Sequence, residues 1–264
     1  MKFFVTGGRG FVGLNLVGEL RKNPKNKVLV YDKDVCRKIK LKNDFDVIYH
    51  LAANTDTRYP DDVDMYRNNI AGFLNILDFA LKGKSKLVYA SSAAIYGDYQ
   101  KTAYANSKEL VDEIAKFFFN RLSIVGLRFF NVYGPHEKQK GKMASMVTNW
   151  ALQLKSGKNP KVFKEERQSK RDFVYVKDIV KALQTAIKTK NGIYDAGTGN
   201  PRTFDDVLKS VEDNLGIKKE PIYISNPYKG RYQRFTKAKL GWGFKPDYSL
   251  EEGVKDYLTN YFPR

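Results

Sequence analysis

A tyrosine and a lysine four positions apart, Tyr104 and Lys108, are the residues of this sequence best suited to proton chemistry. In a helix, a four-residue step places both side chains on one face, roughly 40° apart around the axis. A nearby ammonium group favours the tyrosinate and lowers the pKa of a phenol from its ordinary value near ~10. The pair therefore predicts a tyrosine that exchanges a hydroxyl proton while a hydride moves to or from a nicotinamide cofactor.

A serine at the end of a strand-like run adds a hydrogen-bonding group to this chemistry. The segment Ser91–Gly97 directly follows the apolar run 86–90, which places Ser92 at the carboxyl end of a strand. There its hydroxyl can hydrogen-bond the reacting oxygen of a substrate. His50, at the end of another such run, is interpreted as a buried strand-end residue rather than a catalytic group.

Glycines at positions 7, 10 and 13 lie between a strand-like run and a helical pattern. This spacing permits a tight turn, close approach of the backbone to a pyrophosphate, and close packing of helix on strand. The helix that follows offers unpaired N–H groups and the positive end of its dipole. Asp32 ends the next strand-like run, where a carboxylate can accept hydrogen bonds from ribose hydroxyls. The segment therefore predicts a dinucleotide site.

The choice between NAD and NADP stays open at this stage, with a slight preference for NADP. Asp32 alone disfavours a 2′-phosphate through charge repulsion. Four basic residues nearby can compensate: Arg9, Lys33, Arg37 and Lys38.

Short strand-like runs alternate with helical patterns through the first half of the chain. The strand-like runs are 2–6, 27–31, 46–51, 86–90 and 123–129. The helical patterns between them are 13–22, 64–81 and 104–119. Such alternation predicts an α/β fold of the Rossmann type, a doubly wound parallel sheet whose ligands bind beyond the carboxyl ends of the strands.

The expected organisation is a Rossmann domain that binds NAD(P) over residues 1–155 and a smaller α/β region that mainly binds substrate over 156–264. We expect the two to be partly interleaved. Residues 33–45 are too few for a full β-α-β crossover. The third strand and its helix are therefore expected to be reduced or absent, leaving the adenine side of the cofactor site open.

The net charge of +18 favours anionic partners, which include nucleotides and nucleotide-sugars as well as nucleic acid. Because the lysines are scattered, specific nucleic-acid binding is not expected. No apolar run has the ~20 residues that a membrane span needs, and the N-terminal apolar run is too short for a secretory signal. With a single cysteine, Cys36, a cytoplasmic location is expected, and no metal site is expected.

Six motifs, in chain order, resemble the extended short-chain dehydrogenase/reductase family. They are the glycine segment 6–13, His-Leu-Ala-Ala at 50–53, the serine segment 91–97, Tyr-x-x-x-Lys at 104–108, Arg-Phe-Phe-Asn-Val-Tyr-Gly-Pro at 128–135 and Arg-Asp-Phe-Val-Tyr-Val at 171–176. The resemblance implies Ser92, Tyr104 and Lys108 as a catalytic triad. The cofactor contacts expected with it are Gly7, Arg9, Gly10, Phe11, Val12, Gly13, Asp32, Lys33, Leu51, Ala52, Ala53, Asn68, Ala90, Tyr104, Lys108 and Val132.

Segments 137–145, 170–176 and 229–236 are similar to the subgroup of this family that epimerises ADP-glycero-manno-heptose at carbon 6. That subgroup is described as having two opposed acid/base groups, which here correspond to Tyr104 and Lys140. Proton handling on both faces suits transient oxidation of a carbinol and its re-reduction from the other side, without net redox change. The substrate contacts that this resemblance implies are Ser92, Asn131, Lys142, Asn149, Phe163, Arg171 and Tyr232.

Departures from the family pattern leave the substrate open. The loop between Gly97 and Tyr104 is short, Lys142 replaces a serine, and Asn149 replaces a histidine. A UDP-, dTDP- or GDP-sugar 4-epimerase or reductase is the main alternative, and a non-catalytic cofactor-binding or nucleic-acid-binding scaffold is an alternative of another class. The absence of an Asp-Glu pair after Ser92 argues against a dehydratase. The family resemblance also implies a homodimer or a larger homo-oligomer, in which helices 64–81 and 104–119 pair across a two-fold axis as in relatives.

Overall fold

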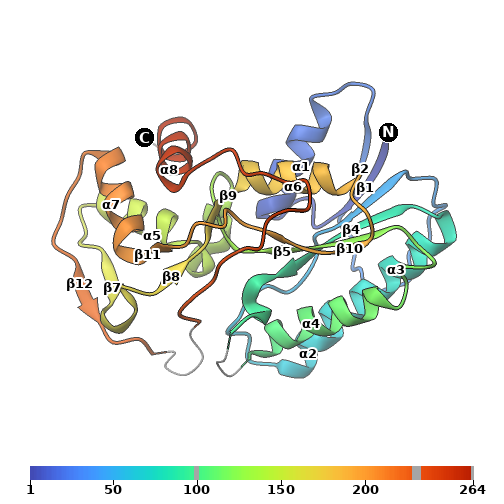
Figure 1. The fold of residues 1–264 in the computed structure, drawn as a ribbon, viewed down its shortest axis with the longest axis horizontal. Coiled ribbons are helices and arrows are strands. Elements are labelled where there is room, and N and C mark those ends of the chain that lie inside the picture. The colour runs from blue at the N-terminus through green and yellow to red at the C-terminus, as the bar shows by residue number, and fades with distance from the viewer. Residues whose placement is uncertain (98–100, 228–232, 263–264) are drawn as a thin grey trace.

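Six parallel strands form the central sheet, in the order β10-β5-β4-β3-β1-β2 (Figure 1). The computed structural model describes residues 1–97, 101–227 and 233–262, without the side chains of residues 138, 139 and 142. The strands are β1 (Lys2–Thr6), β2 (Lys27–Tyr31), β3 (Val47–His50), β4 (Lys86–Ser92), β5 (Ile124–Phe129) and β10 (Gly192–Ala196). The predicted doubly wound parallel sheet is confirmed.

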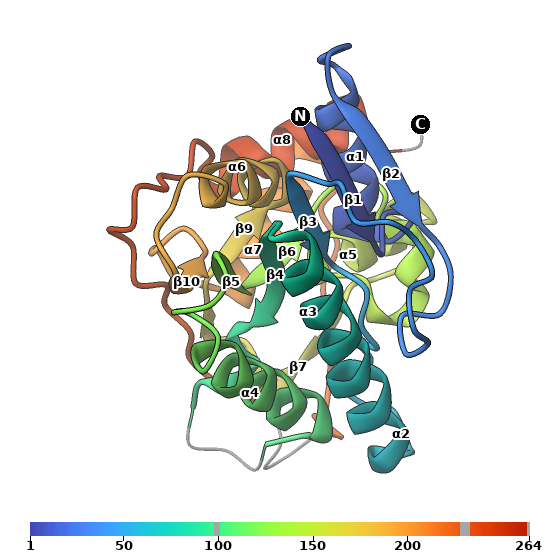
Figure 2. The same ribbon diagram turned by 90° about the vertical axis from the view of Figure 1, so that its right-hand side faces the viewer.

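Helices cover both faces of this sheet because successive strand side chains point to opposite sides. On β1, Phe3 and Val5 join one core cluster, whereas Phe4 joins the other. The helices α1 (Phe11–Arg21) and α6 (Val176–Ala186) cover the first face, and α3 (Gly72–Gly83) and α4 (Ala103–Lys116) cover the second (Figure 2). Nearly continuous apolar runs in the strands reflect this burial on both faces.

Residues 32–46 form neither helix nor strand, as the sequence predicts, and β2 is an edge of the sheet. Two hydrogen bonds, each from a side-chain amide to a backbone carbonyl, join this segment to α3. Asn75 Nδ2 donates to the carbonyl of Val35 at 3.0 Å, and Asn43 Nδ2 donates to the carbonyl of Phe79 at 2.6 Å. A coil segment therefore occupies the place of the missing strand and helix.

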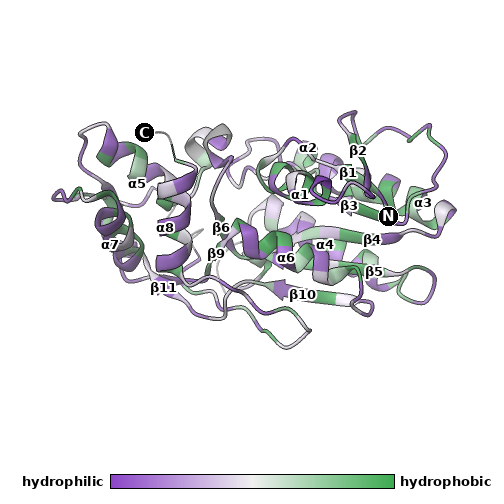
Figure 3. Cartoon of the chain, turned by 90° about the horizontal axis from the view of Figure 1, so that it is seen from above, coloured by the Kyte–Doolittle hydropathy of each residue, from purple (hydrophilic) through white to green (hydrophobic). Residues whose placement is uncertain are grey.

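A second cluster of helices lies beside the sheet and buries its own aromatic core (Figure 3). It contains α5 (Met146–Lys155), α7 (Phe204–Leu215) and α8 (Leu250–Asn260). Three short strand pairs accompany them: β6 (Asn131–Tyr133) with β9 (Phe173–Tyr175), β7 (Lys161–Phe163) with β12 (Ile222–Ile224), and β8 (Lys170–Arg171) with β11 (Arg202–Thr203). The sequence predicts short strands at 161–163 and 221–224, which correspond to β7 and β12, but it does not predict β6, β8, β9 or β11.

The chain passes between the two bodies more than once. Strand β10 comes from the second half of the chain, whereas α5 packs against α7 and α8. The division at residue 155 stays a prediction. No helix in the described ranges is long and apolar enough to cross a membrane, and the location of the protein in the cell stays a prediction.

The expected helix 64–81 is divided into three parts: α2 (Asp62–Tyr66), the π-helical turn Arg67–Ala71, and α3. A π-turn inserts an extra residue into an α-helix and often occurs at functional sites. Here the turn rotates Asn69 into the protein, where its side chain is 3% exposed.

Candidate active site

The glycine loop connects β1 to α1, and each glycine has a different reason to lack a side chain. Gly7 has a φ of +66°, and a Cβ on it would lie 2.6 Å from the backbone nitrogen of Ala52. A Cβ on Gly13 would lie 2.1 Å from the carbonyl oxygen of Gly7. Gly10 is exposed, and only that same oxygen lies within 4 Å of its Cβ position. Bare backbone at the first turn of α1 is therefore available to an anion.

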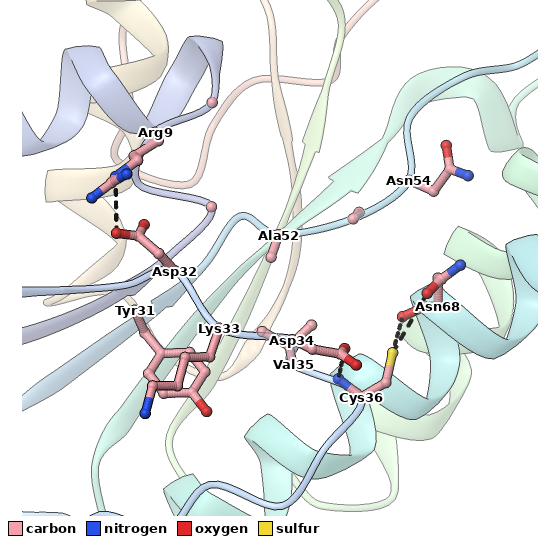
Figure 4. A pocket seen from close by; sticks show the side chains of 13 residues that line it. Arg9, Tyr31, Asp32, Lys33, Asp34, Val35, Cys36, Ala52, Asn54 and Asn68 are labelled. Carbon is pink, nitrogen blue, oxygen red and sulfur yellow. Dashed lines mark hydrogen bonds and ion pairs between the residues drawn. The ribbon is translucent and has the colours of Figure 1, made fainter.

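A cavity of about 560 Å³ opens beside this loop, at the carboxyl end of the sheet (Figure 4). The predicted cofactor residues that line it are Gly7, Arg9, Gly10, Asp32, Lys33, Ala52, Ala53 and Asn68. The Arg9 guanidinium forms an ion pair with Asp32 at 2.9 Å. Cys36, whose thiol pKa is raised by burial, also lines the cavity. The loop, the acidic strand end and the cavity together fit the phosphates and adenosine of a dinucleotide.

The other predicted cofactor residues are not part of the lining of this cavity. Phe11 and Gly13 are buried at the start of α1, Val12, Leu51 and Val132 pack against the core, and Ala90, Tyr104 and Lys108 lie along β4 and α4.

Lys108 is buried next to the end of β4, on the same helix as Tyr104. Its Nζ donates a hydrogen bond to the carbonyl oxygen of Ala90 at 2.9 Å and lies 6.0 Å from the centre of the Tyr104 ring. Burial lowers the pKa of Lys108 from 10.5 to about 8. Ser92 is the last residue of β4, as predicted, and its Oγ accepts a hydrogen bond from the Ala94 amide at 3.1 Å. The structure thus places Ser92 and Lys108 at the carboxyl end of β4, with Tyr104 on the same helix as Lys108.

His50 is a buried structural residue, as interpreted from the sequence. Its Nδ1 lies 2.8 Å from Thr6 Oγ1, and its side chain is 6% exposed. Burial, assisted by the charge of Lys108, lowers the pKa of His50 to about 3. The imidazole is therefore neutral over the physiological pH range.

Asn69 connects the π-turn to the helix that carries the tyrosine, a role that the sequence analysis missed. Its Nδ2 donates to Ser107 Oγ at 2.9 Å, and its Oδ1 accepts the Asn54 amide at 2.8 Å. Ser107 Oγ in turn donates to the carbonyl of Tyr104 at 2.8 Å. The irregular turn thus fixes the first turn of α4.

A buried charge network holds α4 one turn beyond the candidate catalytic lysine, on the same face of the helix. Arg128 Nε donates to Asp112 at 2.9 Å, and Tyr89 Oη donates to the same carboxylate at 2.9 Å. Arg128 Nη1 also donates to Tyr96 Oη at 2.6 Å, and that hydroxyl donates to Asp195 at 2.7 Å. The network joins α4 to β4, β5 and β10, so the helix is fixed relative to the sheet.

Lys140 lies in the 3₁₀ segment Glu137–Met143, which packs against the start of α1. Its Nζ is 5.5 Å from the centre of the Phe11 ring and 3.9 Å from the carboxylate of Glu137. Glu137 is fully buried and accepts hydrogen bonds from Ser145 and Thr148. A charged residue that sequence analysis passed over therefore anchors the segment with the second candidate acid/base group.

The remaining predicted substrate residues lie on several elements of the second body. Asn131 is exposed on β6, Asn149 on α5 donates to the carbonyl of Ala144 at 2.8 Å, Phe163 ends β7, and Arg171 is buried at the end of β8. Tyr232 and the side chain of Lys142 lie outside the described residues.

Comparison with known proteins agrees with this geometry. A family model described as the NAD dependent epimerase/dehydratase family matches residues 3–197. ADP-L-glycero-D-manno-heptose-6-epimerase of Brachyspira hyodysenteriae is 33% identical over a 303-residue alignment, covering 96% of this chain and 95% of that protein.

Two solved structures extend the comparison. The Helicobacter pylori ADP-L-glycero-D-manno-heptose-6-epimerase has a TM-score of 0.89 and 33% identity, covering 97% of this chain and 95% of that one. The Thermotoga maritima UDP-glucose 4-epimerase, solved with UDP-glucose, has a TM-score of 0.86 at 24% identity, covers 98% of this chain and 97% of that one, and shares the fold. This chain therefore belongs to the NAD-dependent epimerase/dehydratase family.

Proposed function

We propose that this protein is an NAD(P)-dependent epimerase of nucleotide-activated sugars, and that its substrate is ADP-glycero-manno-heptose, epimerised at carbon 6. The observation that carries the proposal is the buried Lys108 beside Tyr104. Both lie on the helix that packs at the carboxyl end of β4, and the glycine loop lines a cavity at the same end of the sheet. The heptose assignment is supported by the relatives at 33% identity and by the Lys140 segment.

The residues divide the proton chemistry between them. The Lys108 ammonium stabilises Tyr104 as the phenolate, and this phenolate Oη takes the proton from the sugar hydroxyl and becomes a neutral phenol. Ser92 Oγ hydrogen-bonds the reacting oxygen. The bound nicotinamide supplies hydride acceptance and hydride return. Lys140 serves as the acid/base group for the opposite face of the sugar, so the proton and hydride return with inverted configuration and no net redox change.

The test is interconversion of the two ADP-heptose epimers, followed by NMR without added reductant. Tyr104→Phe should lower kcat by about 10²–10⁴-fold, the range for loss of a general acid/base. Tyr223→Phe, at an exposed position on β12, is the matched control. Lys140→Ala should abolish turnover, and Lys116→Ala, an exposed lysine on α4, should not.

Three results would redirect the assignment. Turnover of UDP-, dTDP- or GDP-sugars by folded protein that leaves ADP-heptose unchanged would replace the substrate. Net consumption of NADPH would indicate a reductase. No turnover on any of these substrates, with tight and salt-dependent binding to duplex DNA, would indicate a scaffold.

We further propose that the cofactor site accepts NADP in preference to NAD. The ion pair with Arg9 neutralises Asp32, and the Arg9 side chain is 80% exposed, so it is accessible to a 2′-phosphate. Lys33 adds a second positive charge to the cavity lining. Titration calorimetry should show that Arg9→Ala weakens NADP⁺ binding about tenfold, the effect of one lost charge-assisted hydrogen bond, while NAD⁺ binding stays within about twofold. Tighter binding of NAD⁺ than NADP⁺ by the wild type would contradict the proposal.

Finally, we propose a homodimer formed through α3 and α4, which lie side by side on one face (Figure 2). Leu74, Leu110 and Phe117 are 45%, 46% and 82% exposed there. Leu110→Glu should convert a dimer to a monomer in light scattering. Leu240→Glu, at a leucine 42% exposed elsewhere, should leave the mass unchanged. A wild-type monomer would refute this proposal.

A further inference from the structure

Gln233 joins the substrate side of the site to the catalytic side by three hydrogen bonds. Its Nε2 donates to the carbonyl oxygens of Ala93 at 3.0 Å and Tyr96 at 2.7 Å. Its Oε1 accepts a hydrogen bond from Arg171 Nη1 at 2.8 Å. Both N–H donors of this half-buried amide and one lone pair of its oxygen are therefore directed at two segments far apart in the sequence.

The carbonyl groups that Gln233 contacts belong to the turn that holds the candidate catalytic serine. Ser92 ends β4, and the 3₁₀ turn Ala93–Ile95 begins at the next residue. The Tyr96 amide closes that turn on the Ala93 carbonyl at 3.1 Å. The amide of Gln233 thus spans both ends of the turn, at the two carbonyls whose positions set its shape.

The third contact of Gln233 holds the guanidinium group of Arg171 in place. Arg171 is 5% exposed at the end of β8, and its Nη1 is held by the same amide that holds the turn. A long side chain held in one rotamer needs less ordering when an anionic group binds to it. The orientation of Arg171 and the shape of the serine turn are therefore set together.

We propose that Gln233 is a positioning residue that couples the binding of the nucleotide-sugar at Arg171, a substrate contact that the family resemblance implies, to the placement of Ser92. The inference rests on the proposed function for its substrate. It assigns to Gln233 two separable effects, one on substrate binding through Arg171 and one on the chemical step through the serine turn.

Substitution by glutamate and by alanine tests the two effects. In Gln233→Glu a carboxylate oxygen still accepts from Arg171, but the other oxygen faces the carbonyls of Ala93 and Tyr96 and donates nothing. The carboxylate also neutralises Arg171, so we expect kcat to fall about tenfold, the order of one or two lost hydrogen bonds, and KM to rise. Gln233→Ala removes all three contacts, so kcat falls similarly and KM rises about tenfold.

A double-substitution cycle with Arg171→Ala tests the coupling. In the Arg171→Ala background, Gln233→Ala should no longer raise KM but should still lower kcat. Gln168→Ala is the matched control, because Gln168 is exposed and its side chain donates a hydrogen bond to Asp205 on α7 at 2.8 Å. Equal unfolding midpoints in urea show that the variants are folded.

A measurement that needs no turnover distinguishes this inference from the proposed function. Amide hydrogen exchange of residues 93–97 should accelerate about tenfold in both Gln233 variants and stay unchanged in Gln168→Ala. ADP binding measured by calorimetry should weaken in both Gln233 variants and not in Gln168→Ala. If the wild type does not turn over ADP-heptose but these changes occur, the heptose assignment fails and the inference stands. If exchange and ADP binding in the Gln233 variants match those of Gln168→Ala, the inference is wrong.

Discussion

Replacing Lys108 by methionine should make the protein more stable while it removes the activity. Burial lowers the pKa of Lys108 from 10.5 to about 8. Each pKa unit corresponds to about 1.4 kcal/mol, so the charged lysine opposes folding by about 3 kcal/mol at neutral pH. Methionine fills similar space but cannot donate to the Ala90 carbonyl, a loss of about 1 kcal/mol. We therefore expect Lys108→Met to raise the free energy of unfolding by about 2 kcal/mol at pH 7.

The stability that Lys108→Met gains over the wild type should decrease as the pH rises. Below pH 8 the lysine is charged in both states, and its burial penalty is fully present. Between pH 8 and 10.5 the folded state has released the proton and the unfolded state has not, so the stability of the wild type rises with pH. The advantage of Lys108→Met, about 2 kcal/mol at pH 7, should therefore shrink over this range and disappear before pH 10.5, because the wild type recovers about 3 kcal/mol.

Urea unfolding of both proteins at intervals from pH 7 to pH 10 measures this difference directly. Lys116→Met, an exposed lysine on the same helix, should change the free energy of unfolding by less than about 0.5 kcal/mol at every pH. A Lys108→Met protein less stable than the wild type at pH 7, or a difference constant with pH, would refute the reasoning.

Three further predictions concern buried groups and the glycine loop. Asp112→Ala should lower the free energy of unfolding by about 3–5 kcal/mol, because it leaves Arg128 in the protein without its carboxylate; a loss below about 1 kcal/mol in urea would contradict this. The pKa of His50 is lowered by burial to about 3, so its NMR signals should not titrate between pH 5 and 8, and stability should fall with pH below about 6.5 as only the unfolded chain takes up the proton. Gly13→Ala should prevent folding because its Cβ would lie 2.1 Å from a carbonyl oxygen, whereas Gly10→Ala should fold and bind the dinucleotide more weakly, as thermal melts with and without cofactor will show; equal effects of the two substitutions would contradict this.

The sequence predicts the fold wherever local pattern decides the structure. Alternating strands and helices, glycines at fixed spacing and a segment too short for a crossover are all local, and the parallel sheet and the coil at 32–46 follow from them. The two-residue strands β8 and β11 have no pattern of their own, since only the surrounding chain brings them together. The π-turn is not recognisable in the sequence for a different reason, because its hydrophobic spacing resembles that of a continuous helix.

Some residues of the candidate site are likewise recognisable in the sequence, and others are not. Tyr104, Lys108 and Ser92 are recognisable because their chemistry depends on spacing within one or two elements. Gln233 and Glu137 are not, because each acts through partners that tertiary folding supplies. Gln233 reaches carbonyls more than a hundred positions away, and Glu137 is a carboxylate buried within a lysine-rich segment.

Loss of the third strand leaves β2 with an outer edge to which no strand pairs in the described part of the chain. An open edge offers backbone groups to the edge of another molecule and so favours aggregation. Lys27 begins this strand and Lys33 follows it, both exposed, whereas Arg37 and Arg9 form ion pairs with Asp34 and Asp32. Two copies that approach edge to edge each carry a net charge of +18 and repel each other. Because salt screens charges over about 10 Å at 0.1 M, the protein's resistance to aggregation through this edge should depend on ionic strength.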